Sequence, residues 1–157
     1  MIMQPIVLKI HKLLIKKHKT LAVAESSTGG LLSKLLTDIP GSSKYFTLAV
    51  VTYSNRAKKT ILKIPSSFIA KYGAVSYETA QRMSKAIRRL AKTDFGIGIT
   101  GIAGPGGGST RKPKGTVFIA IESKNNKICQ KFKFSGGRGA VRRKAALKAL
   151  ELLRVLI

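Results

Sequence analysis

Serine, tyrosine and lysine side chains follow one another in the first third of the chain in an order that could support acyl transfer. Ser43 is followed by Tyr53 and Lys58, and a lysine amine can act as the general base for a serine nucleophile. A free lysine has a pKa of about 10.4, so a downward shift of about three units, worth roughly 4 kcal/mol, is required. Burial or neighbouring cations can supply that shift. Taken alone, a serine and a lysine at this spacing more often belong to a helix that begins with a capping serine and carries an exposed lysine.

A second serine-rich turn, residues 25–30, reads E-S-S-T-G-G and separates a predicted strand from a predicted helix. It offers the hydroxyl of Ser26 and the backbone N–H groups of Thr28, Gly29 and Gly30, which could hold an anion or an oxyanion. Ordinary capping of the helix explains the same residues equally well. No Gly-Lys-Ser/Thr follows the glycines, so the turn is not a P-loop.

A glycine-rich loop follows a third apolar strand. It reads T-G-I-A-G-P-G-G-G over residues 100–108. Dense glycines allow positive φ angles and a close approach of the backbone to a ligand, and successive N–H groups can form an anion-binding nest. We expect this loop to contact a substrate through Thr100, Gly101, Ala103 and Gly104, although a flexible surface loop is the simpler alternative.

Arg138 and Arg142 lie at the start of the last predicted helix. Cations in the first turn of a helix oppose its dipole and are unfavourable unless an anion binds there. The free N–H groups and the guanidinium groups would together suit a phosphate. Chance placement in a very basic chain accounts for the two arginines equally well.

Apolar periodicity and turn residues predict the elements that must position these segments. Helices are predicted over residues 4–18, from 31 to the break at 40–41, after 54, after 65, over 77–92 and over 139–154. Strands are predicted over residues 20–24, 46–53, 95–100, 115–122 and 128–134. This alternation, with a hairpin near its end, predicts a layered α/β fold with a mixed sheet.

Length and composition predict a single domain over residues 1–157. The sequence has no apolar run of the ~20 residues that a membrane span requires, and its start does not resemble a signal peptide. Cys129 is the one cysteine, while His11 and His18 share one predicted helix, which leaves no ligand set for zinc. We therefore expect a cytoplasmic protein without a metal.

The net charge of +24, from 30 Lys and Arg against 6 Asp and Glu, would favour nucleic acid, anionic lipid or phosphorylated ligands. The cations are scattered along the whole chain, and there is no basic tail or tryptophan. A dedicated nucleic-acid surface concentrates its cations and adds stacking aromatic side chains. We therefore expect mostly solvated surface lysines, and nucleic-acid binding that is at most nonspecific.

Taken together, these segments resemble the CinA carboxy-terminal domain family. The matching motifs are A-E-S-S-T-G-G at 24–30, D-I-P-G-S-S at 38–43, V-T-Y-S-N-x-A-K at 51–58, G-A-V-S at 73–76, T-G-I-A-G-P-G-G-G at 100–108 and K-P-K-G-T-V at 112–117. They run in order over about residues 5–155. Many members of the family have cysteine where this chain has Ser27, so a cysteine nucleophile at that position is excluded.

The resemblance implies a three-layer α/β/α fold with a mixed, mostly parallel sheet. It also implies hydrolysis of nicotinamide mononucleotide to nicotinate mononucleotide and ammonia, without metal or organic cofactor, by a homo-oligomer. In that reaction we expect Ser43 to attack the carboxamide carbon, Lys58 to act as base and Tyr53 to orient the pair. Ser26 and the N–H groups of residues 28–30 would stabilise the oxyanion or hold the amide of the substrate in place.

The other expected contacts are with the substrate, through Asn55, the glycine-rich loop and the two arginines, which would hold the ribose and phosphate. The sequence leaves open whether Ser43, Ser42 or Ser26 is the nucleophile. The sequence also allows two other interpretations, a basic protein associated with nucleic acid and an inactive member of the family.

Overall fold

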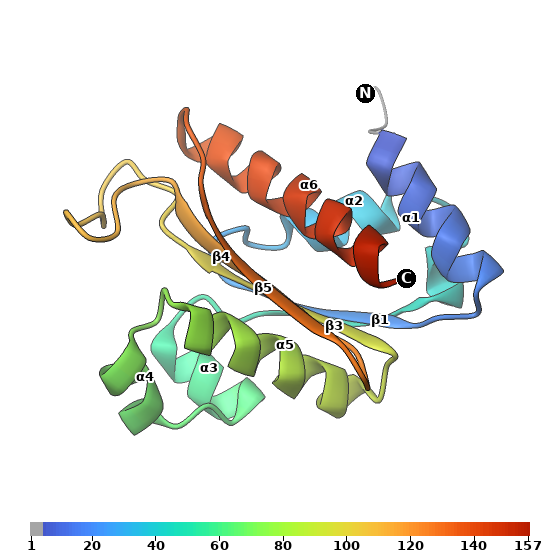
Figure 1. The fold of residues 1–157 in the computed structure, drawn as a ribbon, viewed down its shortest axis with the longest axis horizontal. Coiled ribbons are helices and arrows are strands. Elements are labelled where there is room, and N and C mark those ends of the chain that lie inside the picture. The colour runs from blue at the N-terminus through green and yellow to red at the C-terminus, as the bar shows by residue number, and fades with distance from the viewer. Residues whose placement is uncertain (1–4) are drawn as a thin grey trace.

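A five-stranded mixed sheet runs through the molecule, with helices on both of its faces (Figure 1). In this computed structural model, which describes residues 5–157, the strands are β1 (Leu21–Glu25), β2 (Phe46–Val51), β3 (Phe95–Gly101), β4 (Thr116–Glu122) and β5 (Lys127–Lys133). Their order across the sheet is β2-β1-β3-β4-β5. β1 pairs in parallel with β2 and β3, whereas β4 pairs antiparallel with β3 and β5.

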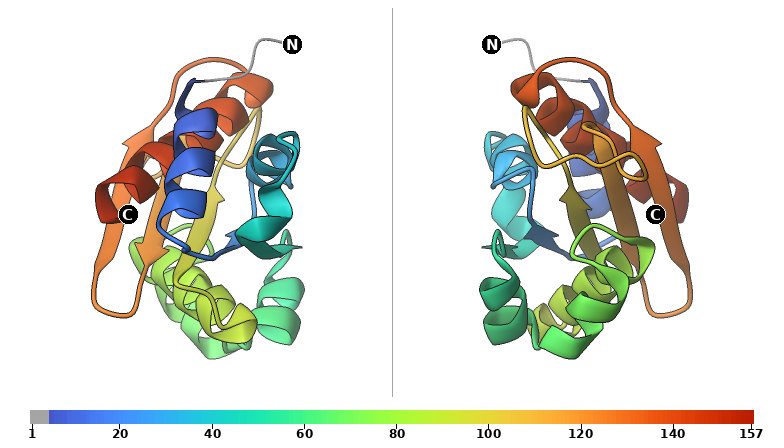
Figure 2. Two further views of the ribbon diagram at one scale, coloured as in Figure 1. Left: turned by 90° about the vertical axis from the view of Figure 1, so that its right-hand side faces the viewer. Right: turned by 90° about the vertical axis from the view of Figure 1, so that its left-hand side faces the viewer.

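The helices form two layers, so the expected three-layer α/β/α fold is confirmed. Helices α1 (Pro5–Lys16), α2 (Leu31–Thr37) and α6 (Arg138–Leu156) cover one face, and α3 (Asn55–Leu62), α4 (Ser66–Tyr72) and α5 (Tyr77–Ala91) cover the other (Figures 1 and 2). A short 3-10 helix, η1 (Ser42–Lys44), precedes β2. Residue 4, where the helix predicted over residues 4–18 begins, lies outside the described residues.

The sheet has one apolar cluster on each face, as the alternation of side chains along a strand requires. In β1, Leu21 and Val23 pack in the cluster beneath α1, α2 and α6, and Ala22 and Ala24 pack in the cluster beneath α5. All four side chains are fully buried. β1 is therefore an internal strand, and its carboxyl end leads directly into the serine-rich turn.

Two glycines in β3 allow α5 to lie directly against the sheet. A Cβ atom at Gly96 would lie 2.2 Å from the carbonyl oxygen of Ser84, and one at Gly98 would lie 2.4 Å from that of Ala80. Real Cβ atoms do not approach backbone oxygens so closely. Glycine at these positions therefore sets the distance between α5 and β3, and with it one wall of the region beyond the strand ends.

The carboxyl ends of the three parallel strands meet at one end of the sheet. There Glu25 of β1 pairs with Val51 of β2 and with Ile99 of β3. The strand predicted over residues 46–53 ends earlier, at Val51, and Tyr53 is exposed in the connection to α3. Ligands of open α/β sheets bind beyond such carboxyl ends.

Within residues 5–157, no helix has both the length and the apolar composition to cross a bilayer. The same residues hold no group of three or more His, Cys, Asp or Glu side chains that could bind a metal ion.

Candidate active site

Lys58 lies on α3, and its ammonium group is buried at the carboxyl end of the sheet. The Ser54 hydroxyl accepts from the N–H of Ala57 and so caps the start of α3. The Lys58 side chain is then directed inward and is 1% exposed. Its Nζ donates to the hydroxyl of Ser26 over 3.0 Å and to the carbonyl oxygen of Thr52 over 2.8 Å.

Burial lowers the pKa of Lys58 to about 8 from the usual 10.5. Water stabilises the ammonium form more than the buried site does, so the neutral amine is favoured. Among residues 5–157 no carboxylate forms an ion pair with this lysine. A substantial fraction of Lys58 is therefore neutral in mildly alkaline solution, and a neutral amine can accept a proton.

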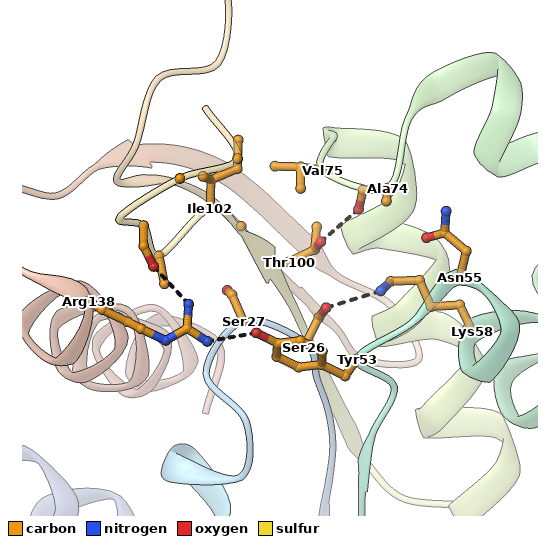
Figure 3. A pocket seen from close by; sticks show the side chains of 15 residues that line it. Ser26, Ser27, Tyr53, Asn55, Lys58, Ala74, Val75, Thr100, Ile102 and Arg138 are labelled. Carbon is orange, nitrogen blue, oxygen red and sulfur yellow. Dashed lines mark hydrogen bonds between the residues drawn. The ribbon is translucent and has the colours of Figure 1, made fainter. Parts of the chain in front are cut away.

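Ser26 is the first residue after β1, and its position is fixed by the backbone on both sides. Its N–H donates to the carbonyl oxygen of Ile99, and its own carbonyl oxygen accepts from the N–H of Gly29. The residue is 7% exposed and its hydroxyl faces Lys58 (Figure 3). A serine hydroxyl next to an amine of lowered pKa has the arrangement of an activated nucleophile.

The buried carboxylate of Glu25 holds the start of α2 in place. It accepts from the N–H groups of Gly30, Leu32 and Ser33 and from the Ser33 hydroxyl. The backbone N–H groups at the start of a helix have no partner within the helix. Here the Glu25 carboxylate accepts hydrogen bonds from them, so they are not free to bind a ligand. Of the N–H groups expected to face a ligand, those of Gly29 and Gly30 instead bind within the protein.

A cavity of about 250 Å³ opens beside the Ser26–Lys58 pair (Figure 3). The structure brings most of the residues predicted for the site to its wall, namely Ser26, Tyr53, Asn55, Lys58, Thr100, Gly101, Ala103, Gly104 and Arg138. Ser27, Ala74, Val75, Ile102, Gly106 and Gly107 complete the lining. The cavity therefore has a serine and a lysine on one side and a glycine-rich backbone on the other.

Ala74 and Val75, which connect α4 to α5, belong to the site although sequence reasoning gave them no role. The Thr100 hydroxyl donates to the carbonyl oxygen of Ala74 over 2.7 Å, and Lys112 Nζ donates to that of Val75 over 2.6 Å. These bonds attach the end of β3 and the segment before β4 to the α4–α5 connection. The motif G-A-V-S at 73–76 was the available signal, since it belongs to the resemblance.

The two arginines at the start of α6 occupy different positions. Arg138 lines the cavity and donates to the carbonyl oxygen of Gly104 over 2.8 Å and to the Tyr53 hydroxyl over 2.7 Å. Arg142 donates from Nε and Nη2 to the carbonyl oxygen of Thr28, over 3.2 and 2.8 Å. Arg138 can therefore reach a ligand in the cavity, whereas Arg142 supports the serine-rich turn.

Ser43 does not meet Lys58. It lies exposed on η1, before β2 begins, while Lys58 follows the strand's other end. The intervening strand has six residues, which corresponds to about 20 Å. The serine that contacts Lys58 is Ser26, so the pair expected from the sequence is replaced by a different one.

Comparison with known proteins agrees with this architecture. The model of the CinA C-terminal domain family matches residues 3–157. A putative competence-damage inducible protein of Thermoanaerobacter sp. (strain X514) is 49% identical over 143 residues, which are 91% of this chain and 35% of that protein. A CinA-like protein of Geobacter sulfurreducens is 43% identical over 145 residues. The chain thus spans about a third of the length of the curated relatives it matches.

Solved structures extend the similarity to three dimensions. The competence/damage inducible protein CihA from Agrobacterium tumefaciens superposes with a TM-score of 0.92 at 33% identity, covering 99% of this chain and 98% of that one. A CinA superfamily protein from Escherichia coli gives a TM-score of 0.93 at 31% identity, covering 99% and 91%. With the family model matched over nearly all of its residues, this chain belongs to the CinA C-terminal domain family.

Proposed function

We propose that the chain is an amidohydrolase that converts nicotinamide mononucleotide to nicotinate mononucleotide and ammonia, with Ser26 as the nucleophile and Lys58 as the base. The observation that carries the proposal is the 3.0 Å contact between the Ser26 hydroxyl and a buried lysine, beside a cavity. Membership in the CinA family is compatible with an enzyme, and the substrate follows from the resemblance to its stand-alone amidases.

The reaction begins with neutral Lys58, whose pKa of about 8 leaves the amine able to accept a proton. As the Ser26 oxygen forms a bond to the carboxamide carbon, its proton passes to Lys58 Nζ. The carbonyl oxygen of the substrate becomes an oxyanion, to which we assign the N–H of Ser27, the residue after the nucleophile, as donor.

Collapse of the tetrahedral intermediate breaks the carbon–nitrogen bond, and Lys58 returns the proton to the departing ammonia. A water molecule then attacks the acyl-serine, and Lys58 accepts its proton. When the bond between the acyl carbon and the Ser26 oxygen breaks, Lys58 returns that proton to the Ser26 oxygen, and the nicotinate product leaves as its carboxylate, with its own proton released to water. Thr52 keeps Lys58 in position throughout, because its carbonyl oxygen accepts a hydrogen bond from Nζ.

Arg138 is the residue that we assign to the phosphate of the nucleotide. Its guanidinium lies at the cavity wall, bound to the neutral oxygens of Gly104 and Tyr53. An anionic oxygen forms a stronger bond with a guanidinium than a neutral oxygen does. No metal or organic cofactor has a role in these steps.

The charge of the chain does not favour nucleic-acid binding as the function. Exposed cations lie on both helical layers, for example Lys12 and Lys16 on α1, and Arg82 and Lys85 on α5. A nucleic-acid surface gathers its cations on one face. We therefore keep the amidase as the single proposal.

The direct test is the release of ammonia when the purified protein is mixed with nicotinamide mononucleotide, with nicotinate mononucleotide identified as the product. Ser26→Ala should remove the activity, and Ser43→Ala should retain it. Absence of turnover by the wild-type protein, with the nucleotide still binding to the cavity, would reject the reaction.

A further inference from the structure

A groove lies between α3 and α5, two helices that contact each other on one face of the sheet (Figure 1). Its volume is about 310 Å³, and it shares no lining residue with the cavity beside Ser26 and Lys58. Ile64 in the groove is 1% exposed, whereas Ile61 and Leu90 are 39% and 55% exposed. The α3–α5 groove therefore leaves apolar surface open to water at a place that the proposed reaction does not use.

Four cations surround this apolar surface. Arg82, Lys85 and Arg89 come from α5, and Lys63 comes from the end of α3. All four side chains are exposed, and none of them forms an ion pair among residues 5–157. None of the six acidic residues of the chain lines the groove. The α3–α5 groove therefore combines apolar side chains with positive charge only.

Two carboxylates lie near this positive charge without pairing with it. Glu78 and Glu122 line a neighbouring cavity together with Arg82 and Lys85. Of the two carboxylates, Glu122 forms an ion pair, and its partner is Arg88, which does not line the groove. The cations of the groove are therefore available to an anionic ligand.

The three cations of α5 form a row along the groove. Residues at positions i, i+3 and i+7 of a helix lie on the same side, and seven residues advance by about 10 Å. A ligand that pairs with the whole row must carry anionic groups over that length. A small amphiphile with one anionic head does not, whereas an acidic helix carries carboxylates one turn apart.

Other classes of partner fit the α3–α5 groove less well. Single-stranded nucleic acid stacks its bases on aromatic rings, and the apolar side chains of the groove are aliphatic. Membrane binding buries an apolar face in lipid, whereas these side chains line a depression. A second copy of this chain would bring a net charge of +24 to a positive surface. An acidic partner with apolar side chains of its own is complementary in both respects.

We propose that the α3–α5 groove binds an acidic amphipathic helix of a partner protein. The apolar face of that helix packs against Ile61, Ile64 and Leu90, and its carboxylates pair with the cations beside them. This is the helix-in-groove mode of peptide recognition. The bound helix leaves the active-site cavity open, because the two sites share no residue. The inference concerns a partner and does not depend on the proposed reaction.

Fluorescence anisotropy with a labelled peptide tests the groove. The probe is a peptide of about 15 residues, composed of Leu, Glu and Ala, with Leu on one face of the helix and Glu on both flanks of that face. A peptide of the same composition in scrambled order, without an apolar face, measures charge attraction alone. At physiological salt we expect the amphipathic peptide to bind about tenfold more tightly or better. Equal binding of the two peptides, or binding of neither, would contradict the proposal.

Charge reversal locates the binding surface. The test variant reverses the row on α5, as Arg82→Glu/Lys85→Glu/Arg89→Glu. The control variant reverses three exposed lysines of α1 with the same spacing, as Lys9→Glu/Lys12→Glu/Lys16→Glu. The α5 variant should weaken binding of the amphipathic peptide by about tenfold or more, and the α1 variant much less. Equal losses would show that the net charge attracts the peptide and that the groove does not.

Replacement of an apolar side chain tests the other half of the contact. Leu90→Gln should weaken binding by about fivefold, while Leu8→Gln, an exposed leucine of α1, should not. Circular dichroism and melting temperature show whether each variant folds. If a triple variant does not, Arg89→Glu and Lys16→Glu replace the pair. Unchanged affinity in Leu90→Gln, or an α5 variant that loses an oligonucleotide or anionic vesicles but keeps the peptide, would overturn the proposal.

Discussion

Serine and lysine occur at both ends of the sheet, in very different environments. At the carboxyl ends of the parallel strands, Ser26 and Lys58 are buried and bonded to each other. At the opposite end, Ser43 and Lys44 lie exposed on η1. Burial lowers the pKa of Lys58 to about 8. The environment of a lysine, more than its residue type, therefore determines whether it can act as a base.

The largest expected effect distinguishes the two serines. Ser26→Ala removes the nucleophile, so we expect kcat for nicotinamide mononucleotide to fall by about 10⁴-fold or more. Ser43→Ala should change kcat less than about twofold, because a surface serine outside the machinery contributes little to the chemical step. Steady-state ammonia release measures both. A large loss with Ser43→Ala and near-normal turnover with Ser26→Ala would reverse the assignment.

The next effect concerns the base. Lys58→Met should lower kcat by about 10²–10⁴-fold, the usual contribution of a general base. Lys58→Arg should fail as well, since a guanidinium does not lose its proton in proteins. For the wild type we expect kcat/KM to rise with pH up to about 8, as Lys58 becomes neutral. A flat pH profile would show that another group accepts the proton.

The same lysine should make stability depend on pH. Burial lowers the pKa of Lys58 to about 8 from 10.5, so the unfolded chain holds a proton that the folded protein has released between these values. The free energy of unfolding then rises with pH. From pH 7 to pH 10 this contribution grows by about 2–3 kcal/mol.

Urea unfolding at pH 7 and pH 10 measures the change in the free energy of unfolding. The contribution of Lys58 is the difference in this change between the wild type and Lys58→Met. The exposed Lys44→Met at the other end of the sheet is the matched control for the loss of one positive charge. If Lys58→Met shows the same pH dependence as the wild type, the lysine is not desolvated.

A smaller effect should separate the two arginines of α6. Arg138→Ala should weaken kcat/KM for the nucleotide by about 10- to 100-fold, which corresponds to the loss of a charged hydrogen bond. The same variant should lower kcat/KM for the unphosphorylated riboside much less. Arg142→Ala should keep the preference for the phosphorylated substrate and lower the melting temperature, because Arg142 binds the carbonyl oxygen of Thr28.

Lys16→Gln, on α1, is the control for a general loss of positive charge. It should leave kcat/KM nearly unchanged apart from weaker steering at low salt. If Arg138→Ala keeps the preference for the phosphorylated substrate, the phosphate is held elsewhere, and the backbone of the glycine-rich loop is the next candidate.

Much of the fold could be predicted from the sequence, because periodicity and turn residues report local preferences. Each predicted strand has a counterpart, and the β2 boundary was wrong where Thr52 and Tyr53 leave the sheet after pairing ends at Val51. The mixed character of the sheet followed from the closing hairpin of β4 and β5. The close packing of α5 against β3 could not be predicted, because the glycines of β3 do not by themselves indicate which helix lies against them.

The candidate site was predicted less completely, because motifs give order along the chain and not distance. Ser43 and Lys58 flank a strand that was itself predicted, and that strand alone implies that they lie at opposite ends. Ser26 was recognised but given a supporting role. Glu25 as the cap of α2 was not foreseen, since a buried carboxylate that binds three backbone donors leaves no periodic signal.

That Glu25 carboxylate has a thermodynamic consequence. It fastens the turn from Ser26 to the first residues of α2 by bonds to Gly30, Leu32 and Ser33, so the turn is already ordered before a ligand enters the cavity. Ordering the backbone of a residue costs about 1–2 kcal/mol in conformational entropy. In this turn the cost is met during folding and not on ligand binding. Ligand capture at this turn should therefore show a small entropic penalty and little change in backbone mobility, in contrast to sites whose loops order on binding.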